Sequence, residues 1–130
     1  LTPEVSDRRA AILSAYRAIR RHEMALAEKL IRGLLEIPSL RFYGISDPAR
    51  FAERCPTVGI RLAHHSPLET ATFLGDRGIF TWDGNYYALN LTERLGVEKA
   101  GGFLRIGIVH YNTAGEVERT LAALRVLASR

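Results

Sequence analysis

The 130-residue sequence contains little cysteine, little lysine and no long apolar run, and these shortages exclude whole classes of protein. The one cysteine, Cys55, cannot form an internal disulfide, and the N-terminus carries no basic-then-apolar signal segment. We therefore expect a reducing, cytoplasmic location. No apolar run exceeds four residues, so we expect no membrane span. Only Lys29 and Lys99 among the 18 basic residues are lysines, so arginine supplies nearly all of the positive charge.

The composition that remains is that of an ordinary folded domain. Hydrophobic residues make up 47% and charged residues 25%, with 11 glycines and 5 prolines, which excludes disordered and collagen-like chains. A chain of this length buries roughly two-thirds of its surface, enough for one core, so residues 1–130 are expected to form a single domain. The net charge of +4 permits an anionic partner without requiring one.

Hydrophobic periodicity predicts a long amphipathic helix at the N-terminus. Two overlapping start signals, Thr2-Pro3-Glu4 and Ser6-Asp7, precede it, and it ends before Pro38. Its apolar positions recur at spacings of three, four or seven: Ile12, Tyr16, Ile19, Leu26, Leu30, Leu34 and Ile37. Two capping boxes, Ser66 to Glu69 and Thr113 to Glu116, each start a further helix, and residues 89–95 suit a short one.

Four strands are expected between these helices, over residues 40–45, 57–63, 79–82 and 103–111. The resulting order is α-β-β-α-β-α-β-α. It indicates an α+β fold with helices packed on a mostly antiparallel sheet of about four strands.

Arg105 lies in the middle of the strongest strand pattern, and a guanidinium there needs a partner. Alternation places it on the same face as Phe103, Gly107 and Val109. One interpretation is a fork that binds a carboxylate through two parallel hydrogen bonds, for which arginine is well shaped. The other is an arginine that reaches water or a surface carboxylate, and spacing alone favours this second interpretation.

Other candidate residues carry weaker signals. Trp82, Tyr86 and Tyr87 cluster beside the Asp83-Gly84 turn, which fits either a loop that stacks on a ligand or a loop packed on the sheet. No paired histidine or cysteine spacing predicts a metal site, and Cys55 is expected to be a buried or inert thiol.

The C-terminal third resembles a known family. Residues 104–113, Leu-Arg-Ile-Gly-Ile-Val-His-Tyr-Asn-Thr, followed by Glu116-Val117, are similar to the "RxS...YNT..E" ending of class V aminotransferases, particularly the cysteine desulfurase-like group. Segments 37–44, 56–58 and 78–88 follow the order of that family's C-terminal region. The resemblance covers nearly the whole chain, and residues 105–116 are its most specific part.

The resemblance implies a fold-type I enzyme dependent on pyridoxal 5'-phosphate, of which this chain is the small C-terminal domain. The cofactor-bearing lysine and the catalytic residues would lie in a large domain before Leu1, so this fragment alone is expected to be inactive. The expected partners are an amino-acid substrate, that large domain and a second copy of the full-length enzyme. Arg105 would bind the substrate's α-carboxylate, Asn85, Tyr86 and Tyr87 would shape the pocket, and Tyr111, Asn112 and Thr113 would order the turn into the last helix.

The sequence also departs from the desulfurases. Their persulfide-forming loop reads Gly-His-His-Cys-Ala, whereas residues 84–88 here read Gly-Asn-Tyr-Tyr-Ala, and Tyr87 cannot accept sulfur. The remaining expectation is transamination, β-elimination, epimerisation or decomposition of an amino acid. The alternative hypothesis is a free-standing basic α+β module that binds RNA or an acidic partner through its sheet or its arginine-rich first helix.

Overall fold

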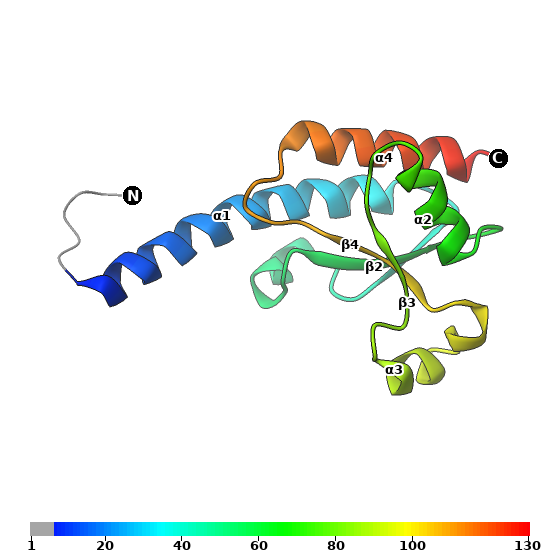
Figure 1. Ribbon diagram of the computed structural model, residues 1–130, viewed down its shortest axis with the longest axis horizontal. Helices are drawn as coiled ribbons and strands as arrows, with labels where there is room; N and C mark the ends of the chain where they lie inside the picture. Colours follow the sequence, from blue (N-terminus) through cyan, green and yellow to red (C-terminus); the bar gives the residue numbers. More distant parts are fainter. Residues whose placement is uncertain (1–6) are drawn as a thin grey trace.

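The computed structural model describes residues 7–130 and has the expected α+β architecture (Figure 1). Its helices and strands follow the predicted order, with two short 3-10 helices added. They are α1 (Arg8–Leu35), β1 (Leu40–Tyr43), η1 (Pro48–Glu53), β2 (Thr57–Leu62), α2 (Pro67–Gly75), β3 (Trp82–Gly84), α3 (Leu89–Arg94), η2 (Glu98–Ala100), β4 (Phe103–Gly107) and α4 (Ala114–Ala128).

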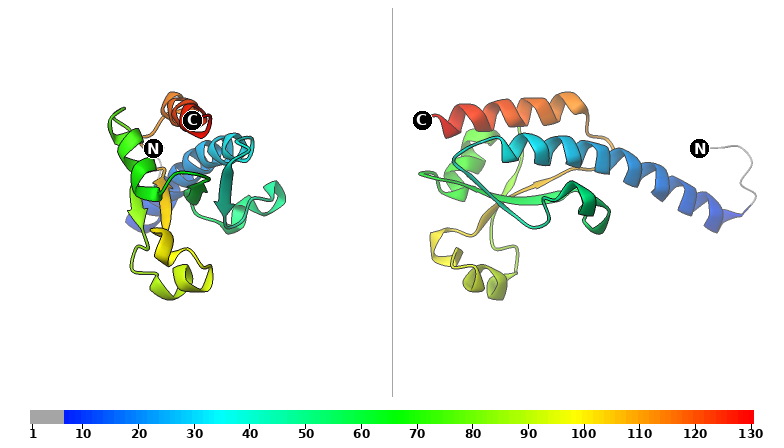
Figure 2. Two further views of the ribbon diagram at one scale, coloured as in Figure 1. Left: turned by 90° about the vertical axis from the view of Figure 1, so that its right-hand side faces the viewer. Right: turned by 180° about the vertical axis from the view of Figure 1, so that it is seen from behind.

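The four strands form one sheet in the order β1-β2-β4-β3, and each neighbouring pair is antiparallel. Helices α1 and α4 lie side by side on one face of this sheet, whereas α3 lies on the opposite side (Figures 1 and 2). The strands therefore have one face covered by helices and one open face.

The core lies between the sheet and the covering helices. Alternate strand residues point into it, because successive side chains of a strand face opposite sides. From the sheet come Val58, Ile60 and Leu62 of β2 and Leu104 and Ile106 of β4, all buried. From α1 come Leu30, Ile31 and Leu34, each at most 1% exposed. The β2–β4 register, with Ile60 opposite Leu104, brings the two strands' buried rows together.

The N-terminal half of α1 does not join this core. The sequence pattern placed Ile12 and Tyr16 on a buried face, but they are 44% and 66% exposed. The reason is geometric, since the helix continues past the edge of the sheet and α4 (Figure 1). Asp7 caps its first turn, with Oδ1 accepting from the Arg9 amide at 3.2 Å. The predicted start at Thr2-Pro3-Glu4 lies outside the described residues.

All four strands differ in bounds from the prediction, and the first two end one or two residues early, at Tyr43 and Leu62. The third strand begins at Trp82 instead of residue 79, because the Ile79 amide donates to the Leu74 carbonyl at the end of α2. The last strand ends at Gly107 instead of residue 111, because the Val109 amide donates to the Asn112 side chain at 2.9 Å. In both cases a local hydrogen bond takes the donor that a longer strand would need.

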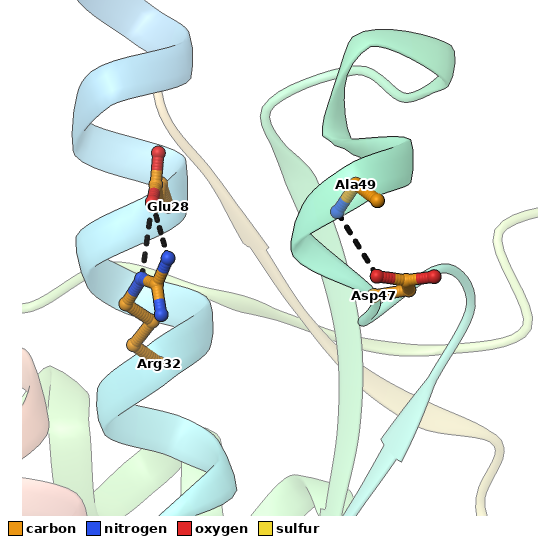
Figure 3. A network of polar contacts seen from close by, with 4 residues as sticks. All are labelled: Glu28, Arg32, Asp47 and Ala49. Atoms are coloured by element: carbon orange, nitrogen blue, oxygen red, sulfur yellow. Dashed lines mark hydrogen bonds and ion pairs between the residues drawn. The ribbon is translucent and has the colours of Figure 1, made fainter.

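Side chains fix the N-terminal ends of α2 and α4, as the sequence predicted. Both capping boxes are confirmed, at Ser66 with Glu69 and at Thr113 with Glu116. Asp47 also caps η1, where its Oδ1 accepts from the Ala49 amide at 2.9 Å (Figure 3). Figure 3 also shows Arg32 donating twice to Glu28, one turn earlier on α1. Such exposed pairs add little stability, so the fold depends mainly on the core.

Within residues 7–130, no helix combines the length and the apolar character needed to cross a bilayer.

The close contact between α1 and α4 predicts that a larger side chain at Gly33 lowers the stability of the fold. A Cβ there would lie 2.4 Å from Cδ1 of Leu121 on α4, so we expect Gly33→Val to overpack the contact and lower the free energy of unfolding by about 1–3 kcal/mol. Gly75→Ala is the control, because a Cβ at Gly75 meets no atom within 4 Å. Thermal unfolding of both variants measures the difference, and equal melting temperatures would contradict the close packing.

Candidate functional site

Arg105 lies on the open face of the sheet, in β4, one of the two central strands. Its register partners are Gly59 on β2 and Trp82 on β3. Gly59 has no side chain, which leaves room beside Arg105 on one flank, and Trp82 lines the other. Arg105 is exposed, whereas Phe103 on the same side of the strand is buried.

Two aromatic rings hold the Arg105 guanidinium. Its central carbon lies 4.8 Å from the ring centroid of Tyr86 and 5.5 Å from that of Trp82, both within range of a cation–π interaction. Within residues 7–130, no carboxylate lies within ion-pair distance of this guanidinium. The site therefore presents an oriented cation whose hydrogen-bond donors are free to bind an anion.

Hydrogen bonding of the Tyr86 hydroxyl fixes the position of its ring. The hydroxyl lies 2.6 Å from the Phe103 carbonyl oxygen and also contacts the Trp82 carbonyl oxygen, so it can donate to either strand. Burial raises the pKa of Tyr86 to about 12, more than the nearby positive charge of Arg105 lowers it. Tyr86 thus stays a neutral hydrogen-bond donor at physiological pH.

The loop that carries Tyr86 has an unusual backbone. Tyr86 and the next residue, Tyr87, have φ angles of 54° and 64°, in the left-handed region that bulky residues rarely adopt. The side chain of Asn85 stabilises this turn, because its Oδ1 accepts from the Tyr87 amide at 3.1 Å. Consecutive strained residues persist only where the surroundings fix them, and they occur preferentially at functional sites.

Glu98 is the anchor of this loop, and the sequence analysis did not identify it. One carboxylate oxygen accepts from Asn85 Nδ2 at 3.0 Å, and the other accepts from the buried hydroxyl of Thr92. Asn85 therefore acts by shaping the loop. Glu98 follows Asn85 by 13 residues with no motif between them, so only the folded chain reveals the contact.

The remaining predicted pocket residue, Tyr87, is fully exposed. It is the next residue after Tyr86, whose ring contacts the Arg105 guanidinium. Trp82, which the sequence analysis noted only as part of an aromatic cluster, is the second ring at the guanidinium.

The Asn112-Thr113 motif lies at the turn between β4 and α4. Asn112 Oδ1 accepts from the Val109 amide. The backbone carbonyl oxygen of Asn112 lies 2.9 Å from Nε2 of His22 on α1. Thr113 forms the capping box, with its amide donating to Glu116 at 2.7 Å. The side chain of Tyr111 is exposed and makes an edge contact with His110. These residues connect α1, β4 and α4.

Cys55 and the histidines lie apart from Arg105. Cys55 was expected to be buried or inert, and the expectation of burial is wrong: Cys55 is exposed, because it lies in the surface loop between η1 and β2. His65 contacts the Leu127 carbonyl at 3.1 Å. In the part of the chain that the structure describes, no three His, Cys, Asp or Glu side chains gather as metal ligands would.

Comparison with known proteins assigns the family. The profile of the aminotransferase class-V family matches residues 11–120. The chain belongs to this family. Curated relatives include an aminotransferase-like protein of Gibberella zeae, 30% identical over 113 residues, and a cysteine desulfurase of Dickeya dadantii, 29% identical over 107 residues. They align with 85% and 82% of this chain but only 27% and 24% of their own lengths.

A solved structure agrees with this assignment. The apo cysteine desulfurase of Thermococcus onnurineus NA1 superposes with a TM-score of 0.76 at 27% identity, over 85% of this chain and 26% of that one. The chain thus spans about a quarter of the length of these class V relatives. The resemblance expected from residues 104–116 is confirmed at the level of the family.

Two adjacent glycines next to the loop beside Arg105 are expected to differ in how well they tolerate a side chain. Gly101 and Gly102 both have left-handed φ angles, 86° and 71°, but only at Gly102 would a Cβ meet backbone, 2.2 Å from the Gly84 carbonyl oxygen. We expect Gly101→Ala to cost about 1 kcal/mol of stability and Gly102→Ala clearly more, with displacement of residues 84–87.

Trp82 is the single tryptophan, so its fluorescence reports this displacement directly while thermal unfolding reports stability. Gly101→Ala is the matched control, since its Cβ would come no closer than 3.5 Å to Pro67. Identical spectra and melting temperatures for the two variants would show that the approach of Gly102 to Gly84 does not hold the loop.

Proposed function

We propose that this chain is the substrate-binding part of a larger pyridoxal phosphate-dependent class V enzyme that acts on an amino acid, and that Arg105 binds the α-carboxylate. The supporting observation is an exposed guanidinium held between the rings of Tyr86 and Trp82, with no carboxylate of residues 7–130 paired to it.

In this proposal Arg105 donates two parallel N–H groups to the two oxygens of the carboxylate. The flanking rings restrict the guanidinium, so little side-chain entropy is lost when the substrate binds. Fixing the carboxylate fixes the orientation of the bonds around Cα, which is the protein's contribution to selecting which bond reacts. The cofactor, when bound, supplies the electron sink.

The residues of this chain do not fit covalent attachment of the cofactor. Such attachment needs a free lysine beside the substrate site. Lys29 pairs with Glu118 on the helical face, and Lys99 lies in η2 beside Glu98 and Glu93. We therefore propose that another part of the protein carries the lysine, and that this fragment alone is inactive. The complete enzyme is proposed to be a cytoplasmic homodimer.

Tyr87 bears on the reaction class. A phenol cannot take up sulfur as a cysteine thiolate does, and Tyr87 is the exposed tip of the loop next to Arg105. We propose transamination, β-elimination, epimerisation or decomposition of an amino acid rather than persulfide formation, with the aromatic loop shaping the pocket. The exposed Cys55 does not replace this group, because it lies between η1 and β2 rather than on the 84–88 loop.

The RNA-binding alternative has less support. An RNA-binding sheet stacks bases on exposed aromatic rings. On the open face here, Phe103 is buried and Tyr43 packs edge-on against it, with ring centroids 4.6 Å apart. These two rings pack on each other, and the more exposed Trp82 lies with Tyr86 against the Arg105 guanidinium.

The carboxylate role predicts a selective kinetic defect. In the protein encoded by the complete gene, we expect Arg105→Ala to lower kcat/KM for amino acids by about 100-fold, mainly through KM, because a charge-assisted contact of roughly 3 kcal/mol is lost. The absorbance of bound cofactor should not change. Arg94→Ala, at the exposed end of α3, is the control and should keep the wild-type KM. An unchanged KM in Arg105→Ala would remove Arg105 from the substrate site.

The cofactor assignment predicts a coloured protein. The complete gene product, purified without added cofactor, should absorb visible light, and the band should shift when the cognate amino acid is added. Titration with single amino acids then identifies the substrate. A colourless protein that gains no band with added pyridoxal phosphate would contradict the proposed function.

A further inference from the structure

The turn that carries Tyr86 needs support from outside itself, because its backbone is strained. Tyr86 and Tyr87 have φ angles of 54° and 64°, and a bulky residue in this region costs free energy. Two hydrogen bonds lie within the turn, from the Ala88 amide to the Asn85 carbonyl at 2.8 Å and from the Tyr87 amide to Asn85 Oδ1. They do not connect the turn to the rest of the molecule, so another contact must hold it in this conformation.

Glu98 supplies such a contact from the neighbouring segment η2. Its side chain accepts a hydrogen bond from Asn85 Nδ2 at 3.0 Å and a second one from the hydroxyl of Thr92, which is fully buried. Because both carboxylate oxygens are engaged, Glu98 is held in one conformation and gives Asn85 one orientation. In that orientation Asn85 presents Oδ1 to the Tyr87 amide and so stabilises the left-handed turn.

The segment that carries Glu98 is itself fixed to the sheet. Helix η2 packs beside α3, away from α1 and α4 (Figure 1). At its end, Arg61 of β2 donates through Nη1 to the carbonyl oxygens of Ala100, at 3.1 Å, and Gly102. A continuous set of contacts therefore runs from β2 through η2 to the turn beside Arg105.

These contacts end at the exposed Arg105 guanidinium, whose central carbon lies 4.8 Å from the Tyr86 ring centroid. An exposed arginine has many rotamers, and restricting it when a ligand binds costs side-chain entropy. A ring held beside the guanidinium removes part of that cost before binding. We propose that Glu98 is a positioning residue: through Asn85 it keeps Tyr86 against Arg105 and so raises the affinity for the substrate's carboxylate. This inference rests on the role proposed above for Arg105.

The negative charge of Glu98 by itself would have the opposite effect. A negative charge on the segment next to the site opposes the binding of an anion at Arg105, so removal of the charge alone should strengthen substrate binding. Loss of the support to the turn should weaken it. The direction of the change in KM therefore separates the positioning role from a purely electrostatic one.

The experiment is a double-mutant cycle in the cofactor-loaded protein from the complete gene. KM and kcat for its amino-acid substrate are measured in the wild type, in Glu98→Ala, in Arg105→Ala and in the double variant. We expect Glu98→Ala to raise KM about three- to ten-fold, the order expected for immobilising one long side chain, with little change in kcat. In the Arg105→Ala background the same substitution should change KM no further, because the residue that Glu98 positions is absent.

Further variants separate positioning from a loss of stability. Glu98→Gln can still accept from Asn85 and can donate to Thr92, so it should keep the wild-type KM. Asn85→Ala leaves Glu98 bound to Thr92 but releases the turn, so it should raise KM as Glu98→Ala does. Glu93→Ala is the matched control and should keep the wild-type KM, because Glu93 is an exposed carboxylate of α3 that forms no ion pair within residues 7–130.

The results that would overturn the positioning role are specific. They are an unchanged or lower KM in Glu98→Ala, a raised KM in Glu98→Gln, a wild-type KM in Asn85→Ala, or a further rise in KM when Glu98→Ala is added to Arg105→Ala. An unchanged KM in Arg105→Ala alone is a different result, since it would contradict the proposed function and with it the inference that rests on it.

Discussion

The burial of Leu104 and Ile106 beneath the covering helices determines which side of the sheet can bind a ligand. Because side chains alternate along a strand, these two residues force Arg105 between them onto the open face. A shift of one residue would place a guanidinium in the core, so the core strongly specifies this register. The position of the candidate site is thus a consequence of hydrophobic packing on the other side of the same strand.

Beyond register, the site needs its guanidinium oriented, and the neighbouring loop does this. Tyr86 reaches Arg105 from a left-handed backbone conformation that costs free energy. Glu98 offsets that cost by binding Asn85 and the buried Thr92 at once. The strained turn and its anchor form one unit, which is why the approach of Gly102 to Gly84 matters as much as any residue at the surface.

The open face holds two kinds of arginine. Arg105 is flanked by aromatic rings, whereas Arg41 and Arg61 are register partners, and Arg61 donates to the carbonyl oxygens of Ala100 and Gly102. The first arrangement suits a single planar carboxylate, and the second fixes the segment from Ala100 to Gly102 against β2. The number of arginines by itself indicates no function. Their positions on the sheet distinguish them, because each position gives the guanidinium different neighbours.

The sequence by itself determined the order of the elements, both capping boxes and the family, because periodicity, caps and the residues from Arg105 to Glu116 are local patterns. It located Arg105 but left its role open, since an alternating pattern does not say which face stays uncovered. Only the tertiary structure decided that the first half of α1 is exposed, that β3 starts at Trp82, and that Glu98 anchors Asn85. Each of these depends on contacts between residues distant in the chain or on competition for one backbone donor, and neither leaves a periodic trace in the sequence.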